Sequence, residues 1–380
     1  MKGLTKIAAL SAFALTAAIT AGGAQAADGP IKIGVQAPIT GEYAAEGQGI
    51  QNSVKLLVNQ QNAAGGLLGR KIEITVCDDE GKPATAAICG RKLVNAGVIA
   101  VIGTYTSGAA LAAAPIYSAA NVIQTSDGTS DELTARGWKT FFRNAPPNSA
   151  EAVFTAEYLV KAKQYKRIVL LSDRSSYATG LVDSVEQAVK RAGGNIVAKD
   201  YVTAGTQDYS AVLTKLKADN PDVLYYSGYY TDGGLIRAQM VQLGMTADFV
   251  GGDANQNAAF AKIAGNAAKG AVIINVPSPE NLPYPEAKKF LADYVKAYGE
   301  QPPSIFAFTN ADGLRAVFAA IEATQSADTA KLIPWLHNMK SFNGLTGPFT
   351  WDKNGERVGS PMMAFEVQAD GSYKPVYQAQ

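Results

Sequence analysis

Between residues 31 and 130 the sequence alternates between short apolar runs and longer amphipathic or alanine-rich segments. The apolar runs have the length and β-branched content of strands that are buried on both faces. The predicted strands span 31–38, 71–77, 98–103 and 122–124, and the predicted helices span 45–64, 83–96 and 109–119. Because strand and helix follow each other in this order, the fold is constrained to a parallel sheet covered by helices on both faces.

A second strand–helix series begins after Arg143. The segment 144–148 contains Pro146 and Pro147 and is expected to form a hinge between two units. The predicted strands are 167–172, 196–202, 223–227 and 248–251, and the predicted helices are 150–163, 180–192, 209–219 and 235–243. Helices at 284–298, 305–323 and 327–339 follow, and then two hairpins with turns at Asn354-Gly355 and Asp370-Gly371. A chain of this length exceeds one hydrophobic core, so two α/β domains are expected.

Two neighbouring strands of the first unit end in loops that are rich in hydroxyl groups. Residues 104–108 follow one strand and residues 125–130 follow the next, and each loop leads toward a helix. Each loop alone is explained by an ordinary connection with Ser/Thr helix caps. Together they lie at the carboxyl edge of a parallel sheet, where small ligands bind. Helix N-termini there favour an anion such as a carboxylate.

The first residues are typical of a secretion signal. Lys2 and Lys6 precede an uncharged segment, 7–21, and Ala24-Gln25-Ala26 fits a cleavage site after Ala26. The segment is short for a permanent membrane anchor. A lipid anchor is not supported either, because there is no cysteine at the cleavage site. We therefore expect residues 1–26 to be a signal peptide and the mature chain to be exported. With 34 Lys and Arg against 33 Asp and Glu, the chain offers no basic face for nucleic acid.

Two cysteines, Cys77 and Cys89, are the only ones in the sequence. An even number in an exported protein favours one disulfide, although two buried thiols would also fit. With no histidine near them, they do not indicate a metal site.

Signatures of catalysis are scarce. His337 is the one histidine and is expected to be a packed helical residue. No nucleophile elbow or phosphate loop occurs, and Gly47-Gln48-Gly49 lacks the third glycine of a dinucleotide fingerprint because Asn52 occupies that position. We therefore expect no enzyme activity, no metal and no cofactor, but a binding protein.

The whole mature chain resembles the periplasmic leucine/isoleucine/valine-binding proteins of ABC importers, which have the type I solute-binding fold. The motifs that carry the resemblance are Val101-Ile102-Gly103 followed by Ser107, Glu132 to Gly137, Tyr177 before Gly180-Leu181, Tyr225 to Tyr229, and Gly347 to Asp352. The resemblance implies two doubly wound α/β lobes joined by a three-strand hinge. The implied crossings are Arg143–Pro146, Asn275–Pro277 and Gly347–Thr350. Lobe 1 would comprise 27–145 and 277–348, and lobe 2 would comprise 146–276 and 349–380.

The resemblance also implies the roles of individual residues. An amino acid's carboxylate would be held by Ser107, the backbone near Asp127, and Thr129. Its ammonium group would meet Asp253, where the family usually has Glu, either directly or through a water. Tyr177, Tyr229, Tyr105 and Phe306 would cover the ligand and line its side-chain pocket, and rings near an ammonium add cation–π attraction.

Glu46 lies where the family often has a ring that touches the ligand's side chain. Either Glu46 points to solvent as a first-turn helix acid, or the ligand carries a polar or cationic group. The implied function is capture of a branched-chain amino acid in the periplasm and its delivery, by a monomer, to an ABC permease in the inner membrane. The alternatives are a polar or basic amino acid, another small carboxylate, or a ligand-sensing role on the same fold.

Overall fold

The computed structural model describes residues 29–359 and 361–378. The expected signal peptide and its cleavage site lie outside the described residues. The first part of the chain forms a five-stranded, fully parallel sheet in the order β2-β1-β3-β4-β5. Its strands are β1 (Ile31–Ala37), β2 (Ile72–Asp78), β3 (Ala100–Gly103), β4 (Ile123–Ser126) and β5 (Phe141–Arg143). All residues of β3 and β4 are buried, as expected for strands that are covered on both faces.

A second sheet has seven strands in the order β15-β14-β10-β9-β8-β6-β7. Five of these strands are parallel, and the hairpin of β14 and β15 adds to β10 in antiparallel fashion. The strands are β6 (Ile168–Ser172), β7 (Ile196–Tyr201), β8 (Val223–Ser227), β9 (Asp248–Gly251), β10 (Val272–Asn275), β14 (Met363–Val367) and β15 (Tyr373–Gln378). The alternating pattern therefore predicted both parallel sheets.

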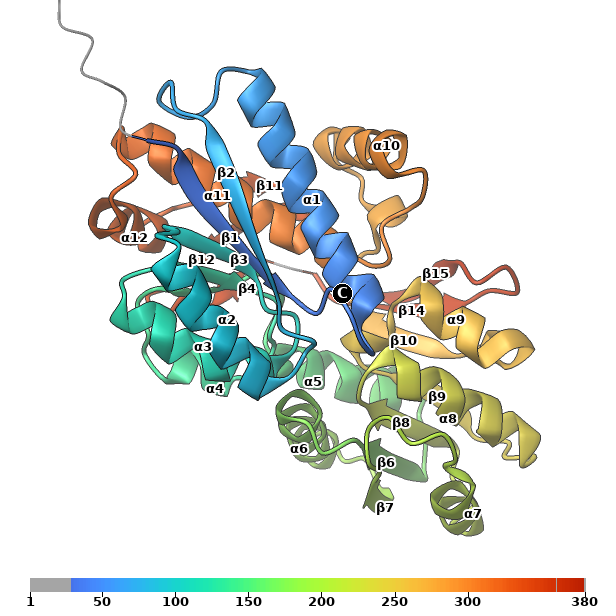
Figure 1. Ribbon diagram of the computed structural model, residues 1–380. Coiled ribbons are helices and arrows are strands. Elements are labelled where there is room, and N and C mark those ends of the chain that lie inside the picture. The colour runs from blue at the N-terminus through green and yellow to red at the C-terminus, as the bar shows by residue number, and fades with distance from the viewer. Residues whose placement is uncertain (1–28, 360, 379–380) are drawn as a thin grey trace, which may run out of the picture.

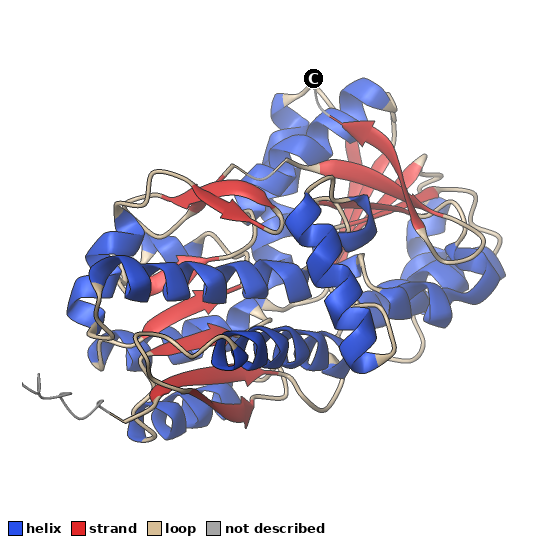
Figure 2. Ribbon diagram, turned by 90° about the horizontal axis from the view of Figure 1, so that it is seen from above, coloured by secondary structure: helices blue, strands red, loops and turns tan. Residues whose placement is uncertain are grey.

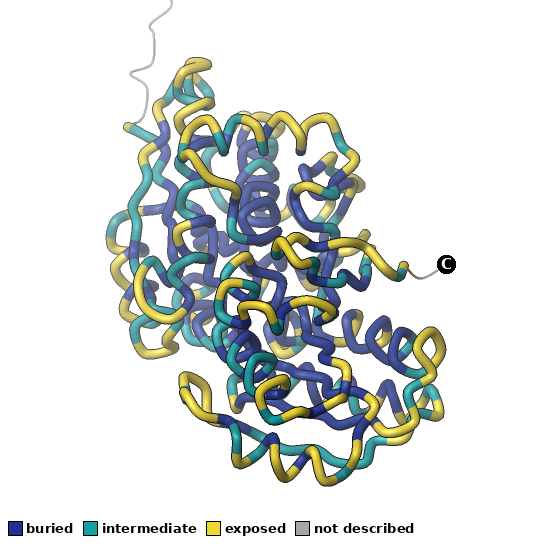
Figure 3. The backbone as a smooth tube through the Cα atoms, turned by 90° about the vertical axis from the view of Figure 1, so that its right-hand side faces the viewer, coloured by how far each residue is buried: buried dark blue, intermediate teal, exposed yellow. Residues whose placement is uncertain are grey.

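Each sheet and the helices that cover it form one lobe of the molecule. Figures 1 and 2 show the sheets of the two lobes apart from each other. The first sheet carries α1 (Ala44–Ala63), α2 (Pro83–Asn95), α3 (Ser107–Ala119), α4 (Glu132–Ala135) and, from late in the chain, α11 (Phe306–Thr324). Helix α10 (Pro285–Tyr298) packs on α1, and α12 (Thr329–His337) packs on α11. The second sheet carries α5 (Asn148–Ala156), α6 (Ser176–Arg191), α7 (Ser210–Ala218), α8 (Tyr230–Gln242) and α9 (Ala258–Ala264). Figure 3 shows the buried segments inside the molecule and the exposed ones on the outer loops and helix faces.

A small antiparallel sheet lies against the edge of the first sheet. It consists of β11 (Phe342–Gly344), β12 (Gly347–Trp351) and β13 (Arg357–Val358). Trp351 Nε1 donates to the carbonyl of Arg143 at 2.6 Å, and Arg143 N donates to the carbonyl of Gly355 at 2.8 Å. The expected third crossing, Gly347–Thr350, therefore lies within this small sheet. The change to the seven-stranded sheet falls between Val358 and Met363.

Helix α8 begins at Tyr230, five residues earlier than the sequence predicted. Two glycines, Gly233 and Gly234, lie in its first turns. In a sequence, such glycines indicate the end of a helix. Their function is close packing, since a Cβ on Gly233 would stand 1.9 Å from Asn255 Oδ1 and one on Gly234 would stand 2.8 Å from Ile263 Cβ. The sequence also missed β5, β10, β11 and α9, which have only three to seven residues each.

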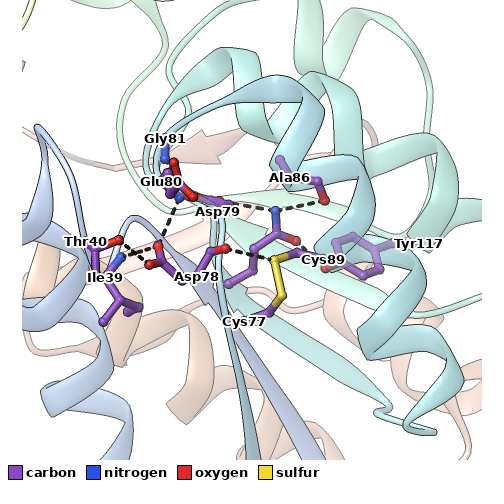
Figure 4. Close-up of a disulfide and its surroundings, with 11 residues drawn as sticks. Ile39, Thr40, Cys77, Asp78, Asp79, Glu80, Gly81, Ala86, Cys89 and Tyr117 are labelled. Carbon is purple, nitrogen blue, oxygen red and sulfur yellow. Dashed lines mark hydrogen bonds between the residues drawn. A yellow bond between two sulfur atoms is a disulfide. The ribbon is translucent and has the colours of Figure 1, made fainter.

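Cys77 and Cys89 form a disulfide, which confirms the expected pairing. The bond joins the end of β2 to α2, and the Cα atoms are 5.6 Å apart. Figure 4 shows that it lies beside Asp78, which accepts hydrogen bonds from Ile39 N at 2.9 Å and Thr40 Oγ1 at 2.5 Å. The disulfide therefore stabilises the end of β2. Asp78, at that strand end, binds the turn that precedes α1. A loop of this length corresponds to about 2–3 kcal/mol of stabilisation.

Candidate ligand-binding site

Eight of the nine predicted ligand residues line one small cavity between the two lobes. Its volume is about 10 Å³, and Ala254 completes the lining. The first lobe contributes Tyr105, Ser107, Asp127, Thr129 and Phe306, and the second lobe contributes Tyr177, Tyr229 and Asp253. All these residues follow strand ends or begin helices, as expected at the carboxyl edges of parallel sheets. A space of this volume holds about one water molecule, so the lobes have to separate before an amino-acid-sized ligand enters.

The two hydroxyl-rich loops are joined to each other. Thr104 has a positive φ of 61° and its Oγ1 lies 2.7 Å from Ser126 Oγ, which ties the end of β3 to the end of β4. Thr106 caps α3, because its Oγ1 accepts from Ala109 N at 3.2 Å. Ser107 Oγ accepts from Ser130 N at 3.1 Å, so the Ser107 hydroxyl hydrogen can be donated into the cavity. The loops therefore form one rigid edge with hydroxyl donors.

Arg143, a fully buried residue at the end of β5, holds the loop around Thr129 in place. Its guanidinium donates to the carbonyl of Gly128, the carbonyl of Ser130 at 3.0 Å, Thr134 Oγ1 at 3.1 Å and Glu356 Oε1 at 2.7 Å. The carbonyls on either side of Thr129 thus point toward Arg143. Because both carbonyls are occupied there, the Thr129 side chain is presented on the cavity side. This role of Arg143 was not predicted from the sequence, where the only signal is a charge at the end of a short aromatic run.

The Asp127 side chain is engaged by α11. It accepts hydrogen bonds from Thr309 Oγ1 at 2.7 Å and from Asn310 Nδ2. Burial raises the pKa of Asp127 well above its usual range. Thr309 and Asn310 were not recognised from the sequence. With the side chain occupied, the backbone is the part of Asp127 that can contact a carboxylate, which is the contact that the resemblance implied.

Asp253 is the acid of the second lobe. Its Oδ1 accepts from Tyr177 OH at 2.6 Å and from Ala254 N at 2.8 Å. Burial raises the pKa of Asp253 to about 6. Immediately behind it lies Glu151, a second buried carboxyl that the sequence did not single out.

Aromatic rings from both lobes pack against one another at the cavity in tilted and edge-on arrangements. Tyr229 is the centre of this ring cluster, with centroids 5.1 Å from Tyr177, 5.6 Å from Tyr105 and 4.5 Å from Tyr43. Phe306 lies 5.4 Å from Tyr105. Within the described chain the buried Tyr105 hydroxyl has no hydrogen-bond partner. Tyr43, which precedes α1, was missed by the sequence analysis, since a tyrosine in a turn gives no signal of its partners.

Glu46 does not point to solvent, and that expectation is wrong. Only 1% of the residue is exposed. Its carboxyl accepts from Ser304 Oγ at 2.6 Å and from Asn257 Nδ2, on the other lobe, at 2.6 Å. Burial raises the pKa of Glu46 to about 7. Glu46 is not among the residues that line the cavity, and it links the two lobes beside it.

His337 packs against neighbouring residues. The ring of His337 packs on Phe142 at 4.7 Å, and its Nε2 lies 2.9 Å from the carbonyl of Lys139. Residues 29–359 and 361–378 contain no group of His, Cys, Asp and Glu side chains suited to a metal ion. Over the same residues, no helix has the length and apolar character needed to span a membrane.

Comparisons with known proteins show which family and fold the chain resembles. The family model described as periplasmic binding protein matches residues 30–372. The Leu/Ile/Val-binding protein of Escherichia coli K12 is 31% identical over 343 residues, which are 90% of this chain and 92% of that protein. A branched-chain amino acid transporter substrate-binding protein from Streptococcus pneumoniae, solved with isoleucine, has a TM-score of 0.84 at 30% identity and covers 91% of this chain and 99% of its own. An ABC-transporter solute-binding protein from R. palustris, solved with benzoate, shares the fold with a TM-score of 0.83 at 22% identity, over 92% of this chain and 96% of its own.

Proposed function

Since the chain belongs to the periplasmic binding protein family, we propose that it is the solute-binding component of an ABC importer and that its solute is an α-amino acid. The observation that carries this proposal is the cavity between the lobes, which is lined by hydroxyl groups of the first lobe, a buried acid of the second lobe and aromatic rings of both. A zwitterion needs donors at one end and an acceptor at the other. No catalytic step is required, so we propose a binding role and no enzymatic one.

The two ends of the ligand are assigned to different lobes. Ser107, Thr129 and the backbone of Asp127 would hold the carboxylate from the first lobe. Asp253 would hold the ammonium from the second lobe, and the rings of Tyr177 and Tyr229 would add cation–π attraction. Because each lobe supplies half of the site, ligand would favour the closed arrangement over an open one.

For the ligand's side chain we propose a branched-chain or aliphatic group. Tyr105 and Phe306 lie on the same lobe as the hydroxyl loops and offer apolar faces to such a group. Glu46 is satisfied by Asn257 and Ser304, so it does not demand a cationic ligand. The Leu/Ile/Val-binding protein of Escherichia coli and the Streptococcus pneumoniae protein solved with isoleucine support this choice.

The partner and the location follow from the same proposal. The signal peptide would direct the chain to the periplasm with cleavage after Ala26, and the closed protein would dock as a monomer on a permease in the inner membrane. The proposed lobes meet at 145/146 and 276/277 and, from the sheet membership, at about 358 rather than at 348.

A thermal-shift panel tests the ligand class. We expect L-leucine, L-isoleucine or L-valine at 100 times the dissociation constant to add about 2.7 kcal/mol of stability, which for a chain of this size raises the melting temperature by about 2–4 °C. Polar and basic amino acids, γ-aminobutyrate and benzoate form the comparison set. A shift only with basic or polar amino acids would contradict the aliphatic assignment. A response to benzoate and to no amino acid would contradict the amino-acid proposal itself.

A second test addresses the residues that are proposed to bind the ligand's carboxylate. Thr129→Val removes a hydroxyl at constant shape and is expected to raise the dissociation constant for L-leucine by about ten- to hundredfold, because a hydrogen bond to a charged group is lost. Thr125→Val is the matched control, since the buried Thr125 hydroxyl has no hydrogen-bond partner in the described chain and does not line the cavity. Isothermal titration calorimetry measures both. Equal affinity of the two variants would remove Thr129 from the site.

A further inference from the structure

Two buried carboxyl groups, Glu151 and Asp253, meet behind the ring cluster. Glu151 lies on α5, just after the first crossing between the lobes, and Asp253 follows β9. Glu151 is 2% exposed and Asp253 is 4% exposed. Asp253 N donates to Glu151 Oε1 at 3.1 Å, so the two carboxyl groups are neighbours. Asp253 lines the cavity and Glu151 does not, so Glu151 lies on the side of Asp253 that is away from the ligand.

Two neighbouring buried carboxyl groups without a cation share one proton, because two adjacent negative charges are strongly unfavourable. In the part of the chain that the structure describes, no lysine or arginine forms an ion pair with either group. Burial, and then the neighbouring Asp253 charge, raise the pKa of Glu151 well above its usual range, whereas burial brings that of Asp253 to about 6. Asp253 Oδ1 accepts hydrogen bonds of 2.6 and 2.8 Å, whereas Glu151 Oε1 accepts longer ones of 3.1 and 3.4 Å, so the negative charge is better stabilised on Asp253 and the proton on Glu151.

The groups around this acid pair do not neutralise it. The titratable groups that face it from the packed elements are Tyr177 on α6, Tyr225 on β8, Tyr229 before α8, Tyr105 after β3, and Glu46 on α1. Tyr177 OH donates to Asp253 and Tyr225 OH donates to Glu151 Oε1 at 3.4 Å. These hydroxyls supply hydrogen bonds without positive charge, so one negative charge remains at the cavity.

We propose that Glu151 is a positioning residue that works in its neutral form: it donates a hydrogen bond to Asp253 and holds that carboxylate at the cavity, where the ligand's ammonium group binds. This inference rests on the proposed function, because it assumes an amino-acid ligand. An aspartate side chain is one methylene shorter than a glutamate, and Glu151 fixes its carboxylate from behind. The buried Tyr105 hydroxyl, which lines the same cavity without a partner, is a second polar group available to the ligand.

This arrangement restricts the class of ligand. The pair offers one negative charge, which matches one ammonium group. A carboxylic acid without an amine, such as benzoate, would leave the charge of Asp253 buried and unpaired, which is strongly unfavourable. The pair therefore selects zwitterionic α-amino acids over their deaminated counterparts.

Two variants of similar volume test whether Glu151 acts as a hydrogen-bond donor or only fills space. Glu151→Gln keeps a donor toward Asp253 and an acceptor for Asp253 N, so its affinity for L-leucine at pH 7 is expected to stay within about threefold of the unmodified protein. Glu151→Met fills the space without a donor and is expected to weaken binding by about tenfold or more. Calorimetric titration with L-leucine measures the affinities, and circular dichroism with the melting temperature of each protein alone verifies folding.

The pH profile adds a readout that a space-filling role would not give. Binding needs an ionised Asp253, so affinity is expected to fall in parallel for the unmodified protein and Glu151→Gln as the pH drops below about 6. If Glu151→Gln loses as much affinity at pH 7 as Glu151→Met, Glu151 acts as a charge and the inference is wrong. If Glu151→Met binds as well as the unmodified protein, Glu151 has no positioning role. Failure of the unmodified protein to bind L-leucine or any other α-amino acid would overturn the proposed function instead.

Discussion

Replacement of Asp253 by asparagine is expected to raise the dissociation constant for L-leucine by about two to three orders of magnitude. Asparagine has the same shape and can still accept from Tyr177 OH, so the site should keep its structure. The negative charge that balances the ligand's ammonium is lost in a buried site, where truncating one partner of a charge pair costs about 2–5 kcal/mol. The effect is therefore expected in the affinity and not in the fold.

Calorimetric titration and thermal unfolding should be measured on the same preparations. Asp248→Asn is the matched control, because Asp248 begins the same strand, β9, is exposed, and does not line the cavity. The control is expected to bind L-leucine like the unmodified protein. A dissociation constant for Asp253→Asn within about fivefold of the control would show that Asp253 is not the counter-ion of the ligand.

Replacement of Arg143 by methionine is expected to have the largest effect on stability. The side chain is fully buried, and its removal leaves the carbonyls of Gly128 and Ser130 without their donor and Glu356 without its cation. Loss of one partner from a buried ion pair costs about 3–5 kcal/mol. We also expect weaker ligand binding, because the loop that carries Thr129 is no longer held from behind.

Urea unfolding followed by circular dichroism measures the stability effect. Arg136→Met is the matched control, since Arg136 forms an exposed ion pair with Glu132 and surface pairs are worth at most about 1 kcal/mol. Unfolding of the two variants at the same urea concentration would contradict the role assigned to Arg143. A binding defect in Arg143→Met with normal stability would instead place Arg143 in contact with the ligand.

The sequence predicted the features that are encoded locally. Each strand of the two parallel sheets longer than four residues had an apolar run with turn signals beside it, and the hydroxyl-rich loops were visible as composition. The cavity lining was obtained from the resemblance, which transfers the positions of strand ends from one chain to another. The strands β5 and β11, of three residues each, depend on their neighbours for pairing and carried no such pattern.

Features that depend on distant partners could not be predicted. Glu46 has its partners 211 and 258 residues away in the sequence, so nothing near it indicates burial. Arg143 is bonded to Glu356, 213 residues away, and Asp253 to Glu151, 102 residues away. In each case a charged residue is stabilised by contacts between elements that only the folded chain brings together.

The packing of α11 against α1 has a consequence for the order in which the molecule is assembled. The second lobe can build its five parallel strands from one continuous stretch, 168–275, as that stretch leaves the ribosome or an export channel. The first lobe cannot cover α1 until residues 306–324 have also arrived, because α11 packs there. The first lobe is therefore completed only after the second lobe has formed its parallel core. The apolar face of α1 is exposed in the meantime.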